Sequence, residues 1–178
     1  SRLFKPLGIT SLTWGSSPNG INSGGNGLTW KTVDSLKLGI LHLNGGNWHG
    51  KQLISRRWVE EATRTHVSEA QYGYHWWQEN AVNAFYAEGA FGQFSIVFPR
   101  HDAVLALTAG VQDGEALLNL VWDQFPGAFK GLSSERLKFS CLFDSLQPLE
   151  PLHPLGLLSC CNYPHGKHIR IYVPSRLG

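Results

Sequence analysis

The chain has 178 residues, of which 42% are hydrophobic and 12% aromatic, so it can bury the core of a single domain. Its formal net charge is +2, and no basic run is longer than a pair, which argues against nucleic acid as a partner. No apolar run approaches the roughly 18 residues that a transmembrane helix needs, so we expect no membrane segment.

The three cysteines, Cys141, Cys160 and Cys161, are an odd number in one half of the chain, unlike a secreted disulfide framework. We therefore expect a reducing compartment, and the sequence indicates nothing else about localisation. Their spacing relative to His165 and His168 is too short for the usual paired zinc motif, so we expect no metal and no cofactor. The chain contains no Met, so we expect its first residue to be a fragment boundary or a processing point.

Residues 8–29 contain six glycines among Ser, Asn and Pro residues, a composition typical of a long structured loop. Trp14 and Trp30 are expected to anchor this loop to the body of the domain. A helix capped by Thr32 follows, with apolar residues at helical spacing up to the stop signal at residues 44–46.

A second helix is expected to start after a Ser55 cap and to direct three side chains inward, namely Trp58, Val59 and Ala62. Residues 72–77 alternate enough aromatic side chains to predict a strand. A hairpin follows, with strands at 94–98 and 103–108 on either side of the turn-forming residues 99–102.

A third helix is predicted over residues 114–125, capped by Asp113 and ended by Pro126. Beyond residue 146 prolines are frequent, so only short regular pieces such as 169–173 are expected. We divide the chain into a domain at 1–130 and, at 131–178, a linker with the possible start of a truncated C-terminal domain.

Two glycines punctuate the entry to the hairpin at residues 87–93, which predicts exposed backbone N–H groups there. Exposed amides at the mouth of a sheet can stabilise a developing oxyanion, and such a site needs a nucleophile opposite. No Ser in the 178 residues is followed three positions later by Lys, and Arg136 after Ser133 cannot act as a base. The sequence therefore predicts that the chain contains the oxyanion-binding half of an active site and lacks the half with the nucleophile.

Many segments of the chain, in this order, resemble the C-terminal part of the serine β-lactamase and penicillin-binding-protein-like family. The resemblance covers roughly residues 3–126 and is nearest to the 6-aminohexanoate-dimer hydrolase and esterase branches. The matching pieces are residues 3–9, 25–28, 34–39, 41–53, 58–59, 72–74 and 87–93. The resemblance implies an α/β (α+β) fold in which an antiparallel sheet is flanked by helices, β-lactamase/transpeptidase-like but incomplete.

The family resemblance also assigns the site residues. Residues 87–89 occupy the slot of a Lys-Thr-Gly motif, and the backbone N–H of Ala90 would then belong to the oxyanion hole. Ala87 lacks the ammonium group that grips a substrate carboxylate, which departs from penicillin recognition. The expected substrate-binding residues are Ala87, Glu88, Gly89, Phe91, Gly92 and Gln93.

The resemblance implies a fragment of a serine hydrolase that acts on amide, ester or β-lactam bonds through an acyl-enzyme. Because the Ser-x-x-Lys nucleophile and the second motif are missing, we expect the chain to be inactive alone. Its expected partners are a small amide or ester substrate, or the missing N-terminal half of the domain. The alternatives are a noncatalytic peptide- or protein-binding module built on the same sheet, or an unproductive remnant of a broken gene.

Overall fold

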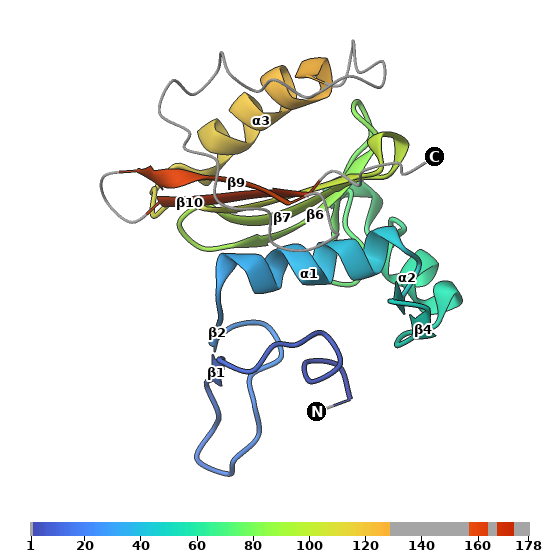
Figure 1. Ribbon diagram of the computed structural model, residues 1–178, viewed down its shortest axis with the longest axis vertical. Coiled ribbons are helices and arrows are strands. Elements are labelled where there is room, and N and C mark those ends of the chain that lie inside the picture. Colours follow the sequence, from blue (N-terminus) through green and yellow to red (C-terminus); the bar gives the residue numbers. More distant parts are fainter. Residues whose placement is uncertain (1, 129–156, 164–166, 173–178) are drawn as a thin grey trace.

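The computed structural model describes residues 2–128, 157–163 and 167–172. Within this part of the chain, one antiparallel sheet lies between two helices, α3 on one face and α1 on the other (Figure 1). The N-terminal segment lies beyond α1, on the side of this helix away from the sheet. The predicted antiparallel sheet flanked by helices is confirmed.

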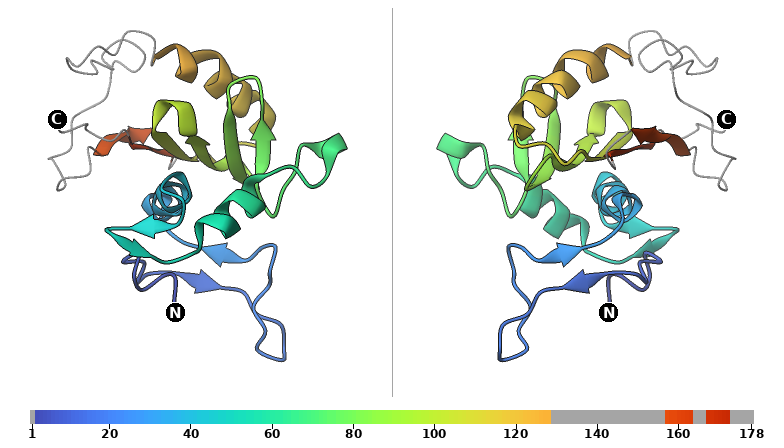
Figure 2. Two further views of the ribbon diagram at one scale, coloured as in Figure 1. Left: turned by 90° about the vertical axis from the view of Figure 1, so that its right-hand side faces the viewer. Right: turned by 90° about the vertical axis from the view of Figure 1, so that its left-hand side faces the viewer.

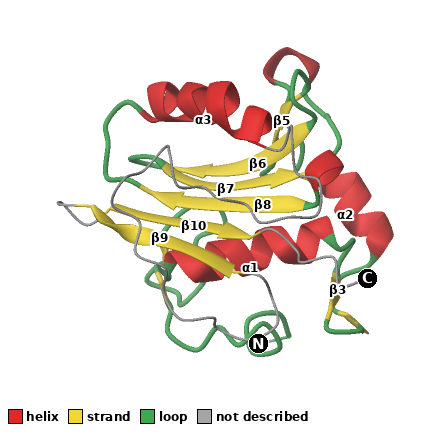
Figure 3. Ribbon diagram, turned by 45° about the horizontal axis from the view of Figure 1, so that its top comes forward, coloured by secondary structure: helices red, strands yellow, loops and turns green. Residues whose placement is uncertain are grey.

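The main sheet has six strands in the order β5-β6-β7-β8-β10-β9 (Figure 3). Each strand pairs antiparallel with its neighbours, so hairpin connections join β5 to β6, β6 to β7 and β7 to β8. The strands are β5 Trp77–Glu79, β6 Ala84–Gly89, β7 Gln93–Phe98, β8 Ala103–Thr108, β9 Leu157–Tyr163 and β10 Lys167–Tyr172. The predicted hairpin at 94–108 is confirmed as β7 and β8, joined by the short 3-10 helix Pro99–His101.

Figure 2 shows α1 and α3 on opposite faces of the sheet, and the alternation of side chains along β7 divides the core between these two faces. Phe94, Ile96 and Phe98 face α3, whereas Ser95 and Val97 face α1. Apolar residues therefore occupy both faces of this central strand, as expected for a sheet covered on both sides. The α3 face is completed by Ala103, Leu105, Leu107, Leu118 and Val121, and the α1 face by Leu36, Ile40, Ala62, Trp76, Val104 and Ala106.

Helix α1 (Thr32–Leu43) begins as predicted, but Thr32 is not its cap. Lys31 holds the N-cap position, and the buried carboxylate of Asp34 accepts a hydrogen bond from the Lys31 backbone N–H at 3.4 Å. An acidic side chain in the first turn stabilises the helix dipole. The Thr32 hydroxyl instead pairs with the hydroxyl of Thr108 on β8 at 2.8 Å.

Helix α2 (Arg56–Thr63) starts after Ser55, whose hydroxyl accepts from the Trp58 backbone N–H at 3.1 Å, as predicted. Val59 and Ala62 are buried, but the prediction that Trp58 faces inward is wrong, because its side chain is exposed. Its ring stacks on the ring of Tyr74 instead, with centroids 5.8 Å apart.

The prediction of a strand at 72–77 is wrong except at its last residue, because β5 contains Trp77–Glu79. His75 has a left-handed backbone (φ 63°), which interrupts an extended chain. Helix α3 (Gly114–Ala128) starts after an Asp113 cap, as predicted, but extends beyond Pro126. Proline removes one N–H donor from the helix ladder, and here the last turn continues past it.

The N-terminal segment packs on α1 through a small core of its own, in which Leu7, Ile9 and Leu41 are buried. It contains a two-stranded sheet of β1 (Thr13–Trp14) and β2 (Leu28–Thr29), so the glycine-rich loop is structured as predicted. The rings of Trp14 and Trp30 both lie against Phe4. Between α1 and α2 lie β3 Asn47–Trp48 and β4 Lys51–Gln52, and before β5 lies the 3-10 helix Ser68–Ala70.

Strand β10 pairs with β8, so two strands from the C-terminal region, β10 and β9, extend the sheet formed by β5 to β8. The predicted strand at 169–173 is confirmed up to Tyr172. The predicted domain boundary at residue 130 lies outside the described residues and stays a prediction, as does the linker.

Candidate active site at the β6–β7 turn

The residues that the sequence assigns to the site lie together where β6 turns into β7. Gly89 ends β6, Gln93 begins β7 opposite it, and Ala90 lies in the turn between the two strands. Ala90 is exposed, and among the described residues we find no hydrogen bond from its amide. As far as the described residues show, this backbone donor is exposed and unpaired.

The turn is fixed by two hydrogen bonds to the segment that follows β8. The N–H of Val111 donates to the Phe91 carbonyl at 3.0 Å, and the N–H of Ala109 donates to the Gly92 carbonyl at 3.1 Å. Gly92 is buried with φ 74°, and a Cβ there would lie 2.8 Å from Val111 Cγ2. Only glycine fits this position, and its close packing fixes one end of the turn that contains Ala90.

Strand β6 is paired over nearly its whole length on the β7 side and over only half of its length on the other side. Strand β5 pairs only with residues 84–86 of β6, whereas β7 pairs with residues 85–89. Among the described residues, no strand pairs with residues 87–89 on the β5 side. An open stretch of strand backbone offers N–H and C=O groups to an extended ligand, and here it leads to Ala90.

Two polar side chains of the predicted site lie on opposite faces of the sheet. Glu88 faces α3, since its carboxylate oxygen would lie 3.7 Å from a Cβ at Gly114 in the first turn of that helix. A carboxylate at this place stabilises the N-terminus of α3. The Gln93 side chain lies over Gly89, whose Cβ, if present, would be 3.0 Å from Gln93 Oε1.

A polar connection between α1 and the sheet borders the site on the Gln93 side. Gln93 is paired with Thr108 across β7 and β8, and Thr108 bonds the hydroxyl of Thr32. Sequence reasoning missed this pair because the two threonines are 76 residues apart and neither belongs to a recognisable motif. It also missed Ala109 and Val111, whose backbone groups rather than side chains hold the turn.

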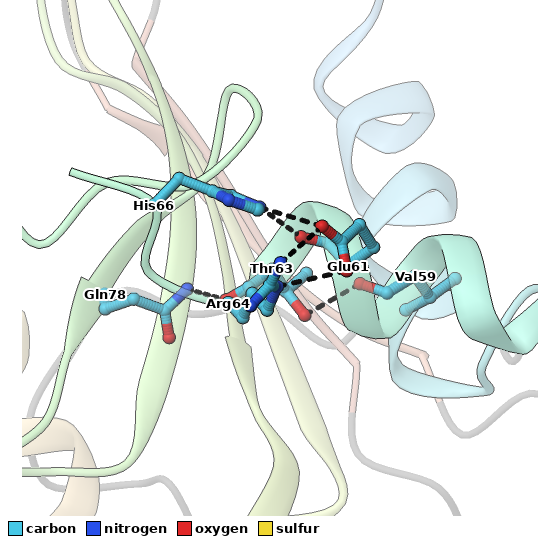
Figure 4. Close-up of polar contacts among 6 residues, drawn as sticks. All are labelled: Val59, Glu61, Thr63, Arg64, His66 and Gln78. Atoms are coloured by element: carbon cyan, nitrogen blue, oxygen red, sulfur yellow. Dashed lines mark hydrogen bonds and ion pairs between the residues drawn. The ribbon is translucent and has the colours of Figure 1, made fainter.

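A second polar cluster joins α2 to β5 (Figure 4). Arg64 donates to the Glu61 carboxylate at 2.7 Å, and His66 Nε2 donates to the Glu61 carbonyl at 2.8 Å. The hydrogen bond from Arg64 lowers the pKa of Glu61. Gln78 on β5 donates to the carbonyl of Thr63 at the end of α2. Of the bonds in this cluster, the one from Gln78 attaches β5 to the end of α2.

Tyr86 on β6 faces α3, where its ring lies against that of Trp122. Burial raises its pKa, and the negative charge of Glu88 adds to the effect. The phenol is therefore neutral at physiological pH.

Within the described ranges, no group of three His, Cys, Asp or Glu side chains could hold a metal ion. No helix in that part of the chain is long and apolar enough to cross a membrane.

Neither a protein-family model nor a curated protein matches this sequence. Among solved structures, the chain is similar to a protein of Bacillus anthracis named as a candidate 6-aminohexanoate-dimer hydrolase, with a TM-score of 0.62 and 19% identity. The similarity covers 72% of this chain and 37% of that chain, so our chain spans little more than a third of that protein. At this identity the comparison shows the fold, which is the expected β-lactamase/transpeptidase-like one.

Proposed function

We propose that the chain forms the oxyanion-stabilising part of a serine hydrolase that cleaves amide, ester or β-lactam bonds. The observation that carries this proposal is the exposed Ala90 amide, held at the open end of β6 by a fixed turn. The fold, shared with a protein named as a candidate hydrolase, supports it.

In this proposal the attacking serine, and the lysine that deprotonates it, come from residues outside these 178. The serine oxygen bonds to the substrate carbonyl carbon, and the π electron pair moves to the carbonyl oxygen, where the Ala90 N–H donates to it. Collapse of this intermediate expels an amine or an alcohol, and water then cleaves the acyl-serine. Loss of one such donor typically costs about 10²- to 10³-fold in rate.

The open half of β6 would hold the rest of the substrate. Residues 87–89 offer backbone groups beside Ala90, and an amide-containing substrate can pair with them as an added strand does. Position 87 is Ala rather than Lys, so this edge has no ammonium group for a substrate carboxylate. We therefore favour uncharged amides and esters over penicillins. We assign Glu88 to the stability of α3 rather than to substrate, because it lies on the opposite face from Gln93.

A fluorophosphonate probe, which reacts with activated serines, tests where the nucleophile lies. We expect no serine of the chain to be labelled and no hydrolysis of p-nitrophenyl acetate above the rate with the heat-unfolded chain at the same concentration. Labelling of any serine among these residues, located by mass spectrometry, would show that the nucleophile is internal and would overturn this assignment of roles.

A second candidate function is a noncatalytic module that binds an extended peptide along β6. The open edge at residues 87–89 favours it, because strand addition needs only such an edge. A backbone NMR titration separates the two functions. The module predicts that an extended peptide shifts the amides of 87–89 while a small tetrahedral anion leaves Ala90 unchanged, whereas the hydrolase predicts a response of Ala90 to the anion.

A further inference from the structure

Phe91 is in a backbone conformation that is unfavourable for a bulky residue. Its φ is 64°, in the left-handed region that costs an L-residue about 1–2 kcal/mol. Six non-glycine residues of the described chain have such angles, and Phe91 is the only apolar one. The other five are His49, Gln71, His75, Asn83 and Asp102.

Burial of the ring does not offset this cost. Phe91 is 62% exposed, although the next residue, Gly92, is buried. The bond from Val111 to the Phe91 carbonyl fixes the backbone, so the ring is held outward. A glycine at position 91 would satisfy the same backbone without strain. Strained residues of this kind concentrate at ligand-binding sites.

We propose that Phe91 contacts the substrate and sets its class. Phe91 directly follows Ala90 and neighbouring Cα atoms lie about 3.8 Å apart, so the exposed ring of Phe91 is within reach of the substituent of a carbonyl held on the Ala90 amide. The ring is free to cover an apolar group, and an aryl group would pack best against it. The site then prefers amides and esters with an aryl or extended alkyl substituent over acetyl compounds. This inference rests on the proposed function.

The test is a backbone NMR titration of the full 178-residue chain with acetamide and with 2-phenylacetamide, which needs no catalysis. Both amides are expected to shift the Ala90 amide resonance, and the aryl compound is expected to bind about fivefold more tightly. Phe91→Gly should remove this preference without lowering the melting temperature, since it relieves strain and deletes an exposed ring. The matched control is Asp102→Gly, which replaces another left-handed residue (φ 50°) at the opposite end of β7 and should keep the preference.

Three results would overturn the inference. One is equal binding of the two amides to the unchanged chain, and another is a preference that survives in Phe91→Gly. In both, a response of Ala90 to acetamide would leave the proposed function standing. The third is a marked fall in melting temperature for Phe91→Gly but not for Asp102→Gly, which would make the ring a packing residue. If neither amide affects Ala90, the proposed function fails and this inference fails with it.

Discussion

Gly39 on α1 lies so close to Val104 on β8 that a Cβ at position 39 would be 2.5 Å from Val104 Cγ1. The same atom would lie 2.9 Å from the hydroxyl oxygen of Ser95, which donates to the Ser35 carbonyl at 3.0 Å. A glycine in the middle of a helix usually costs stability, and here it allows α1 to contact the sheet directly. At the N-terminus of the same helix, the Thr32 hydroxyl bonds that of Thr108 on β8, which is paired with Gln93.

The first prediction concerns this contact. Gly39→Ala should lower the free energy of unfolding by about 1–3 kcal/mol, because overpacking outweighs the gain of about 1 kcal/mol in helix propensity. Urea denaturation followed by circular dichroism measures the change. The control is Gly24→Ala in the N-terminal loop, where a Cβ would meet nothing within 4 Å and no loss is expected. Equal stabilities of the two variants would contradict the close contact.

A second pair of glycines separates backbone strain from packing at the site. Gly92 (φ 74°) and Gly110 (φ 63°) are both left-handed, but only at Gly92 would a Cβ meet neighbours, with Val111 Cγ2 at 2.8 Å. Gly110→Ala should therefore lose about 1–2 kcal/mol, and Gly92→Ala clearly more. Thermal melts of both variants provide the comparison. If Gly92→Ala proves no less stable than Gly110→Ala, the turn is not packed as described.

The third prediction concerns pH. His42 is buried, its Nδ1 donates to the Leu38 carbonyl at 2.9 Å, and its ring lies against Trp76. Burial lowers the pKa of His42 below the ordinary value of 6.5, and the hydrogen bond to Leu38 opposes this only in part. As the pH falls below 6.5, His42 takes up a proton in the unfolded chain but remains neutral in the folded chain. The free energy of unfolding therefore falls as the pH falls.

His42→Phe keeps the packing against Trp76 and removes the titrating group. The free energy of unfolding of the unchanged chain should therefore decrease more steeply below pH 6.5 than that of the variant, by at most about 1.4 kcal/mol per pH unit. Urea denaturation at several pH values between 5 and 7.5 measures both slopes. Identical slopes would mean that His42 takes up its proton as easily in the folded state as in the unfolded one.

The fourth prediction concerns the cap of α2. Ser55→Ala removes the oxygen that accepts from the Trp58 N–H and should cost about 1 kcal/mol of stability. Ser55→Asp keeps a hydrogen-bond acceptor at the same place and should retain most of the stability of the unchanged chain. A loss of the same size in both variants, in parallel urea denaturations, would show that capping is not the role of Ser55.

Local signals in the sequence were sufficient for much of the fold. The caps Ser55 and Asp113 and the β7–β8 hairpin depend on residues close together in the chain, and the structure confirms them. The alternating aromatic residues predict a strand at 72–77, but β5 begins only at Trp77, since they give no sign of the left-handed backbone at His75. Trp58 was placed inward by helical spacing, but its ring stacks on Tyr74, which lies in another segment.

The candidate site was also predictable only in part, because some of its contacts involve residues that are far apart in the sequence. Its residues are consecutive, so a resemblance over one segment could indicate them. The fixed turn and the open strand edge of residues 87–93, however, depend on residues distant in the sequence. Val111 holds the turn, and the short β5 leaves half of β6 open. Neither the hydroxyl pair of Thr32 with Thr108 nor the contact of Glu88 with α3 can be read from spacing.

The central claim is that the Ala90 amide donates to a developing oxyanion. A titration of the ¹⁵N-labelled chain with methylphosphonate, a tetrahedral anion of the right shape, tests it most directly. We predict a saturable downfield shift of the Ala90 amide proton that exceeds the shift of any other amide, with a smaller response in Gly92→Ala, where the turn is disturbed. An Ala90 resonance that does not move, while amides elsewhere on the sheet do, would contradict the account.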